Sequence, residues 1–117
     1  MKTTLTWVGG EHDFDLRIGE LRAIQSECDA GPMEIINALA YGSWRVDMPM
    51  SVLRHGLIGG GMDAKAAREL VDRMFSAHPI GRFVVPAQYV LAAAVVGVEG
   101  DPVGEPEGAT MTPPPES

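Results

Sequence analysis

The sequence predicts a mainly α-helical protein: a small five-helix bundle with an N-terminal β-hairpin and a disordered, acidic, Pro-rich C-terminal tail. Three observations predict this fold class. Apolar and polar residues alternate in residues 3–18. From residue 19 the apolar residues recur at the three- and four-residue spacing of amphipathic helices. After residue 98 the composition shifts to proline, glycine and acidic residues, which leave little to bury. We therefore expect one helical domain over residues 1–98 and a disordered tail over residues 99–117.

The first predicted element is a β-hairpin over residues 3–18. Its two alternating stretches flank Gly9-Gly10, a dipeptide that can supply the positive φ angles of a tight turn. A two-residue loop there pairs Leu5 with Phe14 and places the apolar side chains on one face. These side chains are Leu5, Trp7, Phe14 and Leu16. Because an isolated hairpin is marginal in water, this face should pack against the helices that follow.

Three helices are expected next, over residues 19–29, 32–41 and 47–58. Pro32 is a favoured residue in the first turn of the second helix, and Asp47 is a suitable N-cap for the third. Cys28 is the only cysteine and lies on the apolar side of the first helix, where we expect it to be a small buried apolar residue.

Residues 59–61 are three consecutive glycines. A P-loop would need a Gly-Lys-Ser/Thr ending and a dinucleotide-binding loop would need a preceding strand, and this run has neither. We interpret it as a helix end and a tight turn. Two further helices follow, over residues 63–77 and 80–96, the first with Asp63 as N-cap. Pro86 either kinks the last helix or marks its start. The second half of that helix, residues 90–96, is apolar nearly all round, which predicts the central helix of the bundle.

The net charge of −7 is uneven along the chain. Residues 99–117 hold five of the sixteen acids and none of the nine bases, so residues 1–98 carry only −2. Neither part has the basic stripe that binding to a phosphate backbone needs, and we expect no nucleic acid partner. The longest apolar stretch, residues 83–98, is interrupted and shorter than the roughly 20 residues of a membrane span. With no signal peptide pattern at the start, we expect a cytoplasmic protein without a membrane partner.

Residues that could carry chemistry do not converge in the sequence. The three histidines have no metal-ligand spacing, and the serines lie in no nucleophile-elbow context. The acidic run of residues 11–13 lies on a strand, where neighbours point to opposite faces, and is best interpreted as an exposed edge that resists aberrant pairing. We therefore predict no enzyme activity, no cofactor and no catalytic or metal-binding residue.

Six segments of the chain carry a resemblance through their order and spacing together. These segments are Leu5–Trp7, Phe14–Leu21, Cys28–Pro32, Trp44–Asp47, Leu53–Gly61 and Gly97–Pro106. In this order they resemble the gene-transfer-agent tail proteins called gp10, and the resemblance covers about residues 3–106. This family is similar to the phage tail assembly chaperones, although it has also been described as a tail tube protein family.

The resemblance implies binding without catalysis. Tail assembly chaperones bind the tape measure protein, keep it soluble and recruit tail tube subunits, and they are absent from the mature particle. A structural tail tube or minor tail protein is the alternative. A small helical DNA-binding regulator, suggested by the glycine turn between two helices, is the second alternative. A homo-oligomer is also left open. As partner contacts we predict aromatic and Met residues, namely Trp7, Trp44, Met48, Met50 and Met62.

Overall fold

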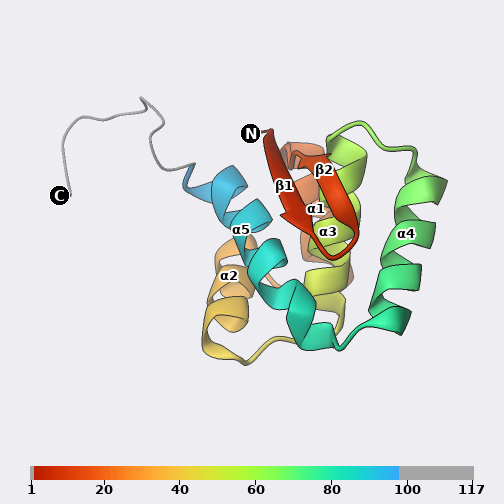
Figure 1. The fold of residues 1–117 in the computed structure, drawn as a ribbon. Helices are drawn as coiled ribbons and strands as arrows, with labels where there is room; N and C mark the ends of the chain where they lie inside the picture. Colours follow the sequence, from red (N-terminus) through yellow and green to blue (C-terminus); the bar gives the residue numbers. More distant parts are fainter. Residues whose placement is uncertain (1, 98–117) are drawn as a thin grey trace, which may run out of the picture.

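The computed structural model describes residues 2–97 (Figure 1), and the predicted tail over residues 99–117 lies outside them. A two-stranded hairpin precedes five α-helices, and the predicted fold class is confirmed. The elements are β1 (Thr3–Trp7), β2 (Gly10–Phe14), α1 (Ile18–Cys28), α2 (Pro32–Tyr41), α3 (Asp47–Gly59), α4 (Ala64–Ala77), the short 3-10 helix η1 (Ile80–Phe83) and α5 (Val84–Val95).

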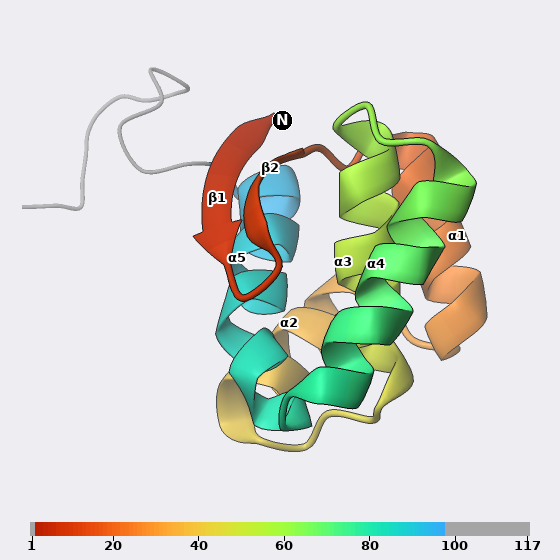
Figure 2. The same cartoon turned by 45° about the vertical axis from the view of Figure 1, so that its right-hand side comes forward.

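The central helix of the bundle is α3. It packs against α1, α2, α4, α5 and β2, and in Figures 1 and 2 it lies between α5 and α4. The prediction that the last helix is central was wrong, because α5 leaves Val85 and Tyr89 exposed. Helices α3 and α5 are both rich in apolar residues, so hydropathy alone does not indicate which of the two is surrounded by other elements. An apolar helix can be central, or it can present an apolar side to solvent or to a partner.

The hairpin register differs from the predicted one by two residues. Leu5 pairs with His12 rather than with Phe14. The turn is formed by residues 8 and 9, and the positive φ of 113° belongs to Gly10, the first residue of β2. Because a shift of two residues keeps every side chain on its face, the apolar residues of both strands still pack on the core, as predicted.

The hairpin is also shorter than predicted. Strand β2 ends at Phe14, and residues 15–17 form an extended linker to α1. Leu16 in this linker is buried, as expected of an apolar hairpin residue, whereas Ile18 is 65% exposed at the first position of α1. The alternating pattern therefore continued past the last paired residue, since an extended linker has the same two-residue period as a strand.

Glycines at the C-terminal end of α3 lie against the backbone of β2 and of this linker. The Asp15 N–H donates a hydrogen bond of 3.0 Å to the Gly56 carbonyl. A Cβ atom at Gly59 would overlap the Asp15 carbonyl oxygen, and one at Gly60 would overlap that of Asp13. The predicted helix end and turn are present, since α3 ends at Gly59. The sequence did not reveal that the same glycines allow β2 and the linker to contact the helix backbone.

The predicted helix boundaries agree with the structure within one residue, except at the start of the last helix. Helix α2 begins at Pro32 and ends before Gly42, which has a φ of 83°. Asp63 caps α4, accepting hydrogen bonds from the N–H groups of Lys65 and Ala66. Asp47 is not the N-cap of α3 but its first residue, where its charge still complements the helix dipole.

The segment before α5 is the 3-10 helix η1, so α5 begins only at Val84. Pro86 lies in the first turn of α5, where its missing N–H removes no helical hydrogen bond. Phe83, at the junction, is completely buried and stacks on Phe75 of α4 with ring centroids 3.9 Å apart. Its ring also meets the edge of Trp7 at 6.1 Å, so this junction connects α4, α5 and the hairpin.

Candidate partner-binding surface

The five residues predicted as partner contacts do not form one surface. Trp7 is 7% exposed and Met48 is 2% exposed, so both are core residues that leave no surface for a partner. Trp44, Met50 and Met62 are half-buried and packed against the core. Met50 lies in the first turn of α3 and Met62 follows its end, so they are at opposite ends of that helix. Contact with a partner at the three half-buried residues stays a prediction.

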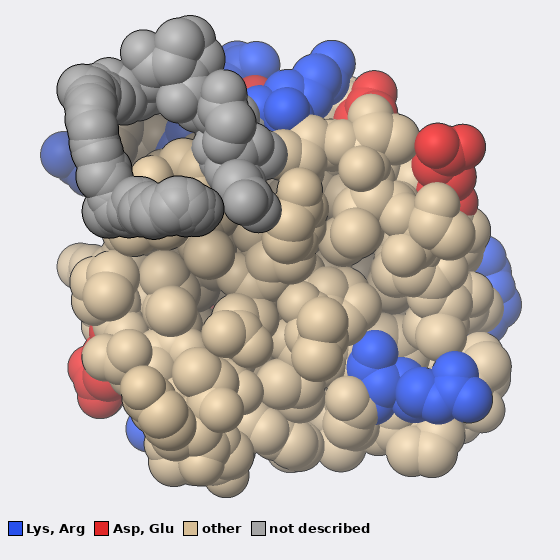
Figure 3. Space-filling model, turned by 60° about the vertical axis from the view of Figure 1, so that its left-hand side comes forward, with Lys and Arg blue, Asp and Glu red and all other residues tan. Residues whose placement is uncertain are grey.

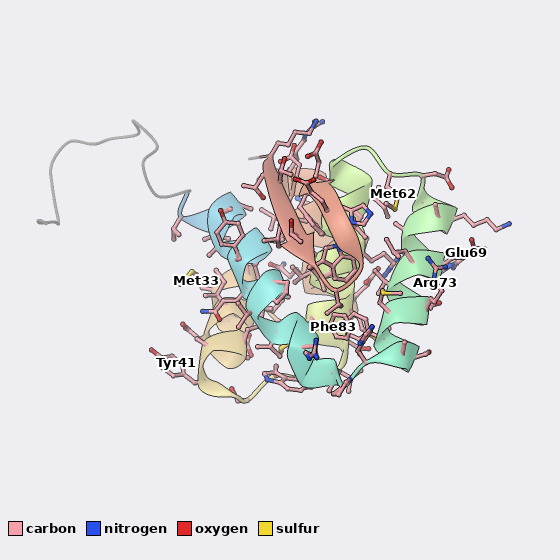
Figure 4. The ribbon with its side chains drawn as sticks, in the orientation of Figure 1. Met33, Tyr41, Met62, Glu69, Arg73 and Phe83 are labelled. Atoms are coloured by element: carbon pink, nitrogen blue, oxygen red, sulfur yellow. The ribbon has the colours of Figure 1, made fainter. Side chains whose placement is uncertain are left out.

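The exposed apolar side chains concentrate elsewhere. Five of the seven large ones belong to α2 and α5 or directly follow α5, and we call their surface the α2/α5 face. These five are Met33, Tyr41, Val85, Tyr89 and Val96. Tyr41 is 84% and Val85 is 72% exposed, and Val85 and Tyr89 are one helical turn apart. In Figure 4, Met33 and Tyr41 project from the outer side of α2, away from Glu69 and Arg73 of α4.

The side of α2 and α5 and the side of α4 also differ in their content of charged residues. Helix α5 contains no charged residue, and α2 contains only Glu34. Figure 3 brings the side of α2 and α5 forward and shows a broad surface with few charged atoms. The outer side of α4, by contrast, is charged with both signs, through Lys65, Arg68, Glu69, Asp72 and Arg73. An exposed apolar surface with a charged opposite side is typical of a protein-binding surface.

The sequence contained a signal for this face that we did not use. We interpret the apolar stretch of residues 90–96 as the sign of a surrounded helix, and the whole of α5, Val84–Val95, carries no charge. Alternatively, such a stretch indicates a helix with one side on the core and the other available to a partner. Only the packing of α5 at the edge of the bundle distinguishes these cases.

A polar cluster connects α1 to α3 on another side of the molecule. Ser51 Oγ and Arg54 Nη2 each donate a 2.7 Å hydrogen bond to Glu27 Oε1, and His55 Nε2 lies 2.9 Å from Oε2. Partial burial acts to raise the pKa of Glu27, but the hydrogen bonds, that of His55 foremost, lower it from 4.5 to about 2. With one carboxylate held by three side chains of α3, the cluster is a structural connection between helices.

Replacing Glu27 by glutamine is expected to destabilise the fold at pH 7 by roughly 1 kcal/mol, a value kept small because solvent screens this half-exposed group. The folded-state pKa is depressed, so this stabilisation is fully present above pH 4.5 and is lost as the pH falls toward 2. Urea denaturation of wild type and Glu27→Gln at pH 7 and at pH 2.5 would measure the difference in unfolding free energy at each pH. Stability differences that are equal at the two pH values would contradict this role.

The structure also shows where the residues with potential catalytic or metal-binding side chains lie. Cys28 is 3% exposed, which confirms the predicted buried position, and burial raises the pKa of its thiol. Glu11 and Asp13 are exposed on β2, while the His12 ring accepts a 2.9 Å hydrogen bond from Trp7 Nε1. Within residues 2–97, no three His, Cys, Asp or Glu side chains are grouped so that they could hold a metal ion. In the same residues, no helix is both long and apolar enough to cross a bilayer.

Comparison with known proteins gives one match. A family model described as phage tail tube protein, GTA-gp10, matches residues 1–97, a range that contains the whole hairpin and all five helices. No curated protein and no solved structure matches the chain. The match confirms the resemblance found in the sequence segments and supports a role among phage tail proteins. The chain belongs to the GTA-gp10 family of phage tail proteins.

Proposed function

We propose that this protein is a tail assembly chaperone that binds the tape measure protein through the α2/α5 face and is released before the particle matures. The observation that carries the proposal is the one-sidedness of the surface. Five of the seven large exposed apolar side chains lie on one pair of neighbouring helices. A protein with a single apolar face is suited to one kind of partner at a time.

The chemistry of the α2/α5 face favours a helical partner with an apolar stripe. Its side chains are aliphatic or aromatic, and α5 offers no charge with which a polar partner could pair. An amphipathic helix laid on such a surface buries apolar area without desolvating an unpaired charge. Tyr41 and Tyr89 can add large contact areas while their hydroxyl groups stay at the rim. A long helical tape measure, exposed before the tube surrounds it, would present such stripes repeatedly.

A tail tube subunit is the second candidate, and the description of the family favours it directly. A subunit of a stacked ring contacts two neighbours within the ring and others above and below, through interfaces that differ from one another. Such a subunit would be expected to show exposed apolar residues on several sides. Outside α2, α5 and the residue after α5, the described part of this chain exposes only Ile18 and Val46 among its large apolar residues.

Aspartates introduced into the α2/α5 face are expected to abolish binding. The double variant Tyr41→Asp/Tyr89→Asp should lower the affinity for the tape measure protein by ~100-fold, because two charges would be desolvated in an apolar interface. Its fold should be retained, since the two side chains are 84% and 43% exposed. Co-expression with tagged tape measure protein, followed by affinity purification and circular dichroism of each variant, would measure both effects.

The matched control introduces the same two charges on the opposite side of the molecule, as Ala66→Asp/Ser76→Asp on α4, where both residues are exposed. This control should bind like wild type. Equal binding by the two double variants would contradict a site on the α2/α5 face. If wild type recovers tail tube subunits but no tape measure protein, the tape measure assignment fails.

A further inference from the structure

The sheet of the described chain has two strands, and their outer edges are in different situations. The outer edge of β2 lies against α3 at its C-terminal end, where the Asp15 N–H just beyond the strand donates to the Gly56 carbonyl and the Asp13 carbonyl lies against Gly60. The outer edge of β1 faces away from the bundle. In Figure 2, β1 forms that border of the molecule, with α5 beneath the hairpin and no described element on the outer side of the strand.

The register determines which backbone groups face outward. Trp7 and Gly10 close the turn, so they form a hydrogen-bonded pair, as do Leu5 and His12 two residues on. The residues that alternate with Leu5 and Trp7 on β1, Thr4 and Thr6, therefore direct their N–H and C=O groups to the free edge. Both threonines are exposed. The same alternation on β2 directs Asp13 toward α3, where its carbonyl is found.

The β1 edge has none of the features that usually protect an exposed edge. Such edges commonly carry charges, prolines or bulges that oppose pairing with another chain. Residues Thr3–Trp7 read Thr-Thr-Leu-Thr-Trp, without charge or proline, and their types favour a strand. Strand β2 does carry charges, Glu11 and Asp13. The strand that α3 already covers is thus the protected one, and the free strand is not.

We propose that two copies of this chain pair through β1, antiparallel about a two-fold axis, to form a four-stranded sheet in the order β2-β1-β1-β2. With the two Leu5 residues facing each other, each Thr4 lies opposite a Thr6 across the axis. Each such pair exchanges two backbone hydrogen bonds, and cross-strand threonine pairs are favourable.

A second copy fits this edge for two reasons. No charge of one β1 strand lies opposite a like charge of the other, and a dimer leaves no free β1 edge for a third copy. A two-fold contact uses the same strand in both copies, and the outer edges of the new sheet are β2 strands, which carry the charges of Glu11 and Asp13 and lie against α3 at their C-terminal ends. The result is a closed dimer rather than a fibre. The pairing does not depend on the α2/α5 face, so it goes beyond the proposed chaperone role and would present two such faces in one assembly.

Concentration-dependent amide exchange on the whole chain tests this pairing without any substitution. From dilute to concentrated protein, exchange at the Thr4 and Thr6 amides should slow by ~10-fold or more as the dimer forms. The Leu5 amide, which already bonds to β2, should not change. Sedimentation over the same range should show the mass doubling.

The variant Thr4→Lys/Thr6→Lys places four like charges along the seam and should stay monomeric. The control Ala66→Lys/Ser76→Lys on α4 should dimerise like wild type. A wild type that is monomeric at every concentration, or a seam variant that still dimerises, would overturn the proposal. So would protection of Thr4 and Thr6 that arises only when a tail tube or tape measure protein is added, since the edge would then bind a strand of another protein. Wild-type dimers without capture of tape measure protein would contradict the chaperone role alone.

Discussion

Replacing Gly59 by alanine is expected to lower the free energy of unfolding by about 3 kcal/mol, near the upper end of the effects of overpacking. The added Cβ would overlap the carbonyl oxygen of Asp15, and a backbone atom cannot move aside as the end of a flexible side chain can. To relieve the overlap, the linker would have to leave α3. That movement would lengthen or break the hydrogen bond from Asp15 to the Gly56 carbonyl.

The expected sign of the stability change makes Gly59→Ala informative. Alanine in a helix is normally more stable than glycine by up to ~1 kcal/mol. The control Gly19→Ala should show that ordinary behaviour, because Gly19 is in α1, has no positive φ and has nothing within 4 Å of an added Cβ. Urea denaturation followed by circular dichroism would compare the two variants. A Gly59→Ala protein as stable as wild type would contradict the close contact between the linker and α3.

Replacing Phe83 by alanine is expected to cost 3–5 kcal/mol, roughly the range for a large buried aromatic residue. Phe83 is completely buried, and its ring stacks on Phe75 and meets the edge of Trp7. Truncation would leave a cavity where η1 joins α5 to α4 and the hairpin (Figure 4). A small domain has only about 5–15 kcal/mol of total stability, so much of the population could unfold.

The matched control for this core position is Val85→Ala, two residues along the chain. Val85 is 72% exposed, so its truncation should change stability by less than about 0.5 kcal/mol. Thermal and urea denaturation of both variants would test the difference. If Phe83→Ala costs less than ~1 kcal/mol, the junction at η1 is not a packed centre of the fold.

The sequence was sufficient where a local signal determines a local structure. Helix α2 was predicted with its observed bounds, because Pro32 at its start and Gly42 after its end act on the residues beside them. The hairpin faces were also predicted, since side-chain parity survives a register error of two residues. The turn itself was misplaced by one residue, since residues 8 and 9 form it and the positive φ belongs to Gly10, the first residue of β2.

Features that depend on distant segments were not predictable in the same way. Gly59 and Gly60 lie against the backbone of residues 13–15 only because the hairpin packs on α3. The glycine run alone indicates only a turn. The predicted contact residues were chosen by type, and type does not separate the core from the surface. Trp7 and Met48 are buried, whereas Tyr41 is highly exposed. The candidate surface became visible only when α2 and α5 were placed side by side.

Mass spectrometric quantification of this protein in purified mature particles, compared with the cells that produce them, tests the chaperone role most directly. A chaperone should be abundant in the producing cells while tails assemble and present at no more than trace amounts in the particles. Tape measure and tail tube proteins in the same samples provide the reference for copy number. A copy number in the particle close to that of the tail tube subunit would contradict the chaperone role and establish a structural one.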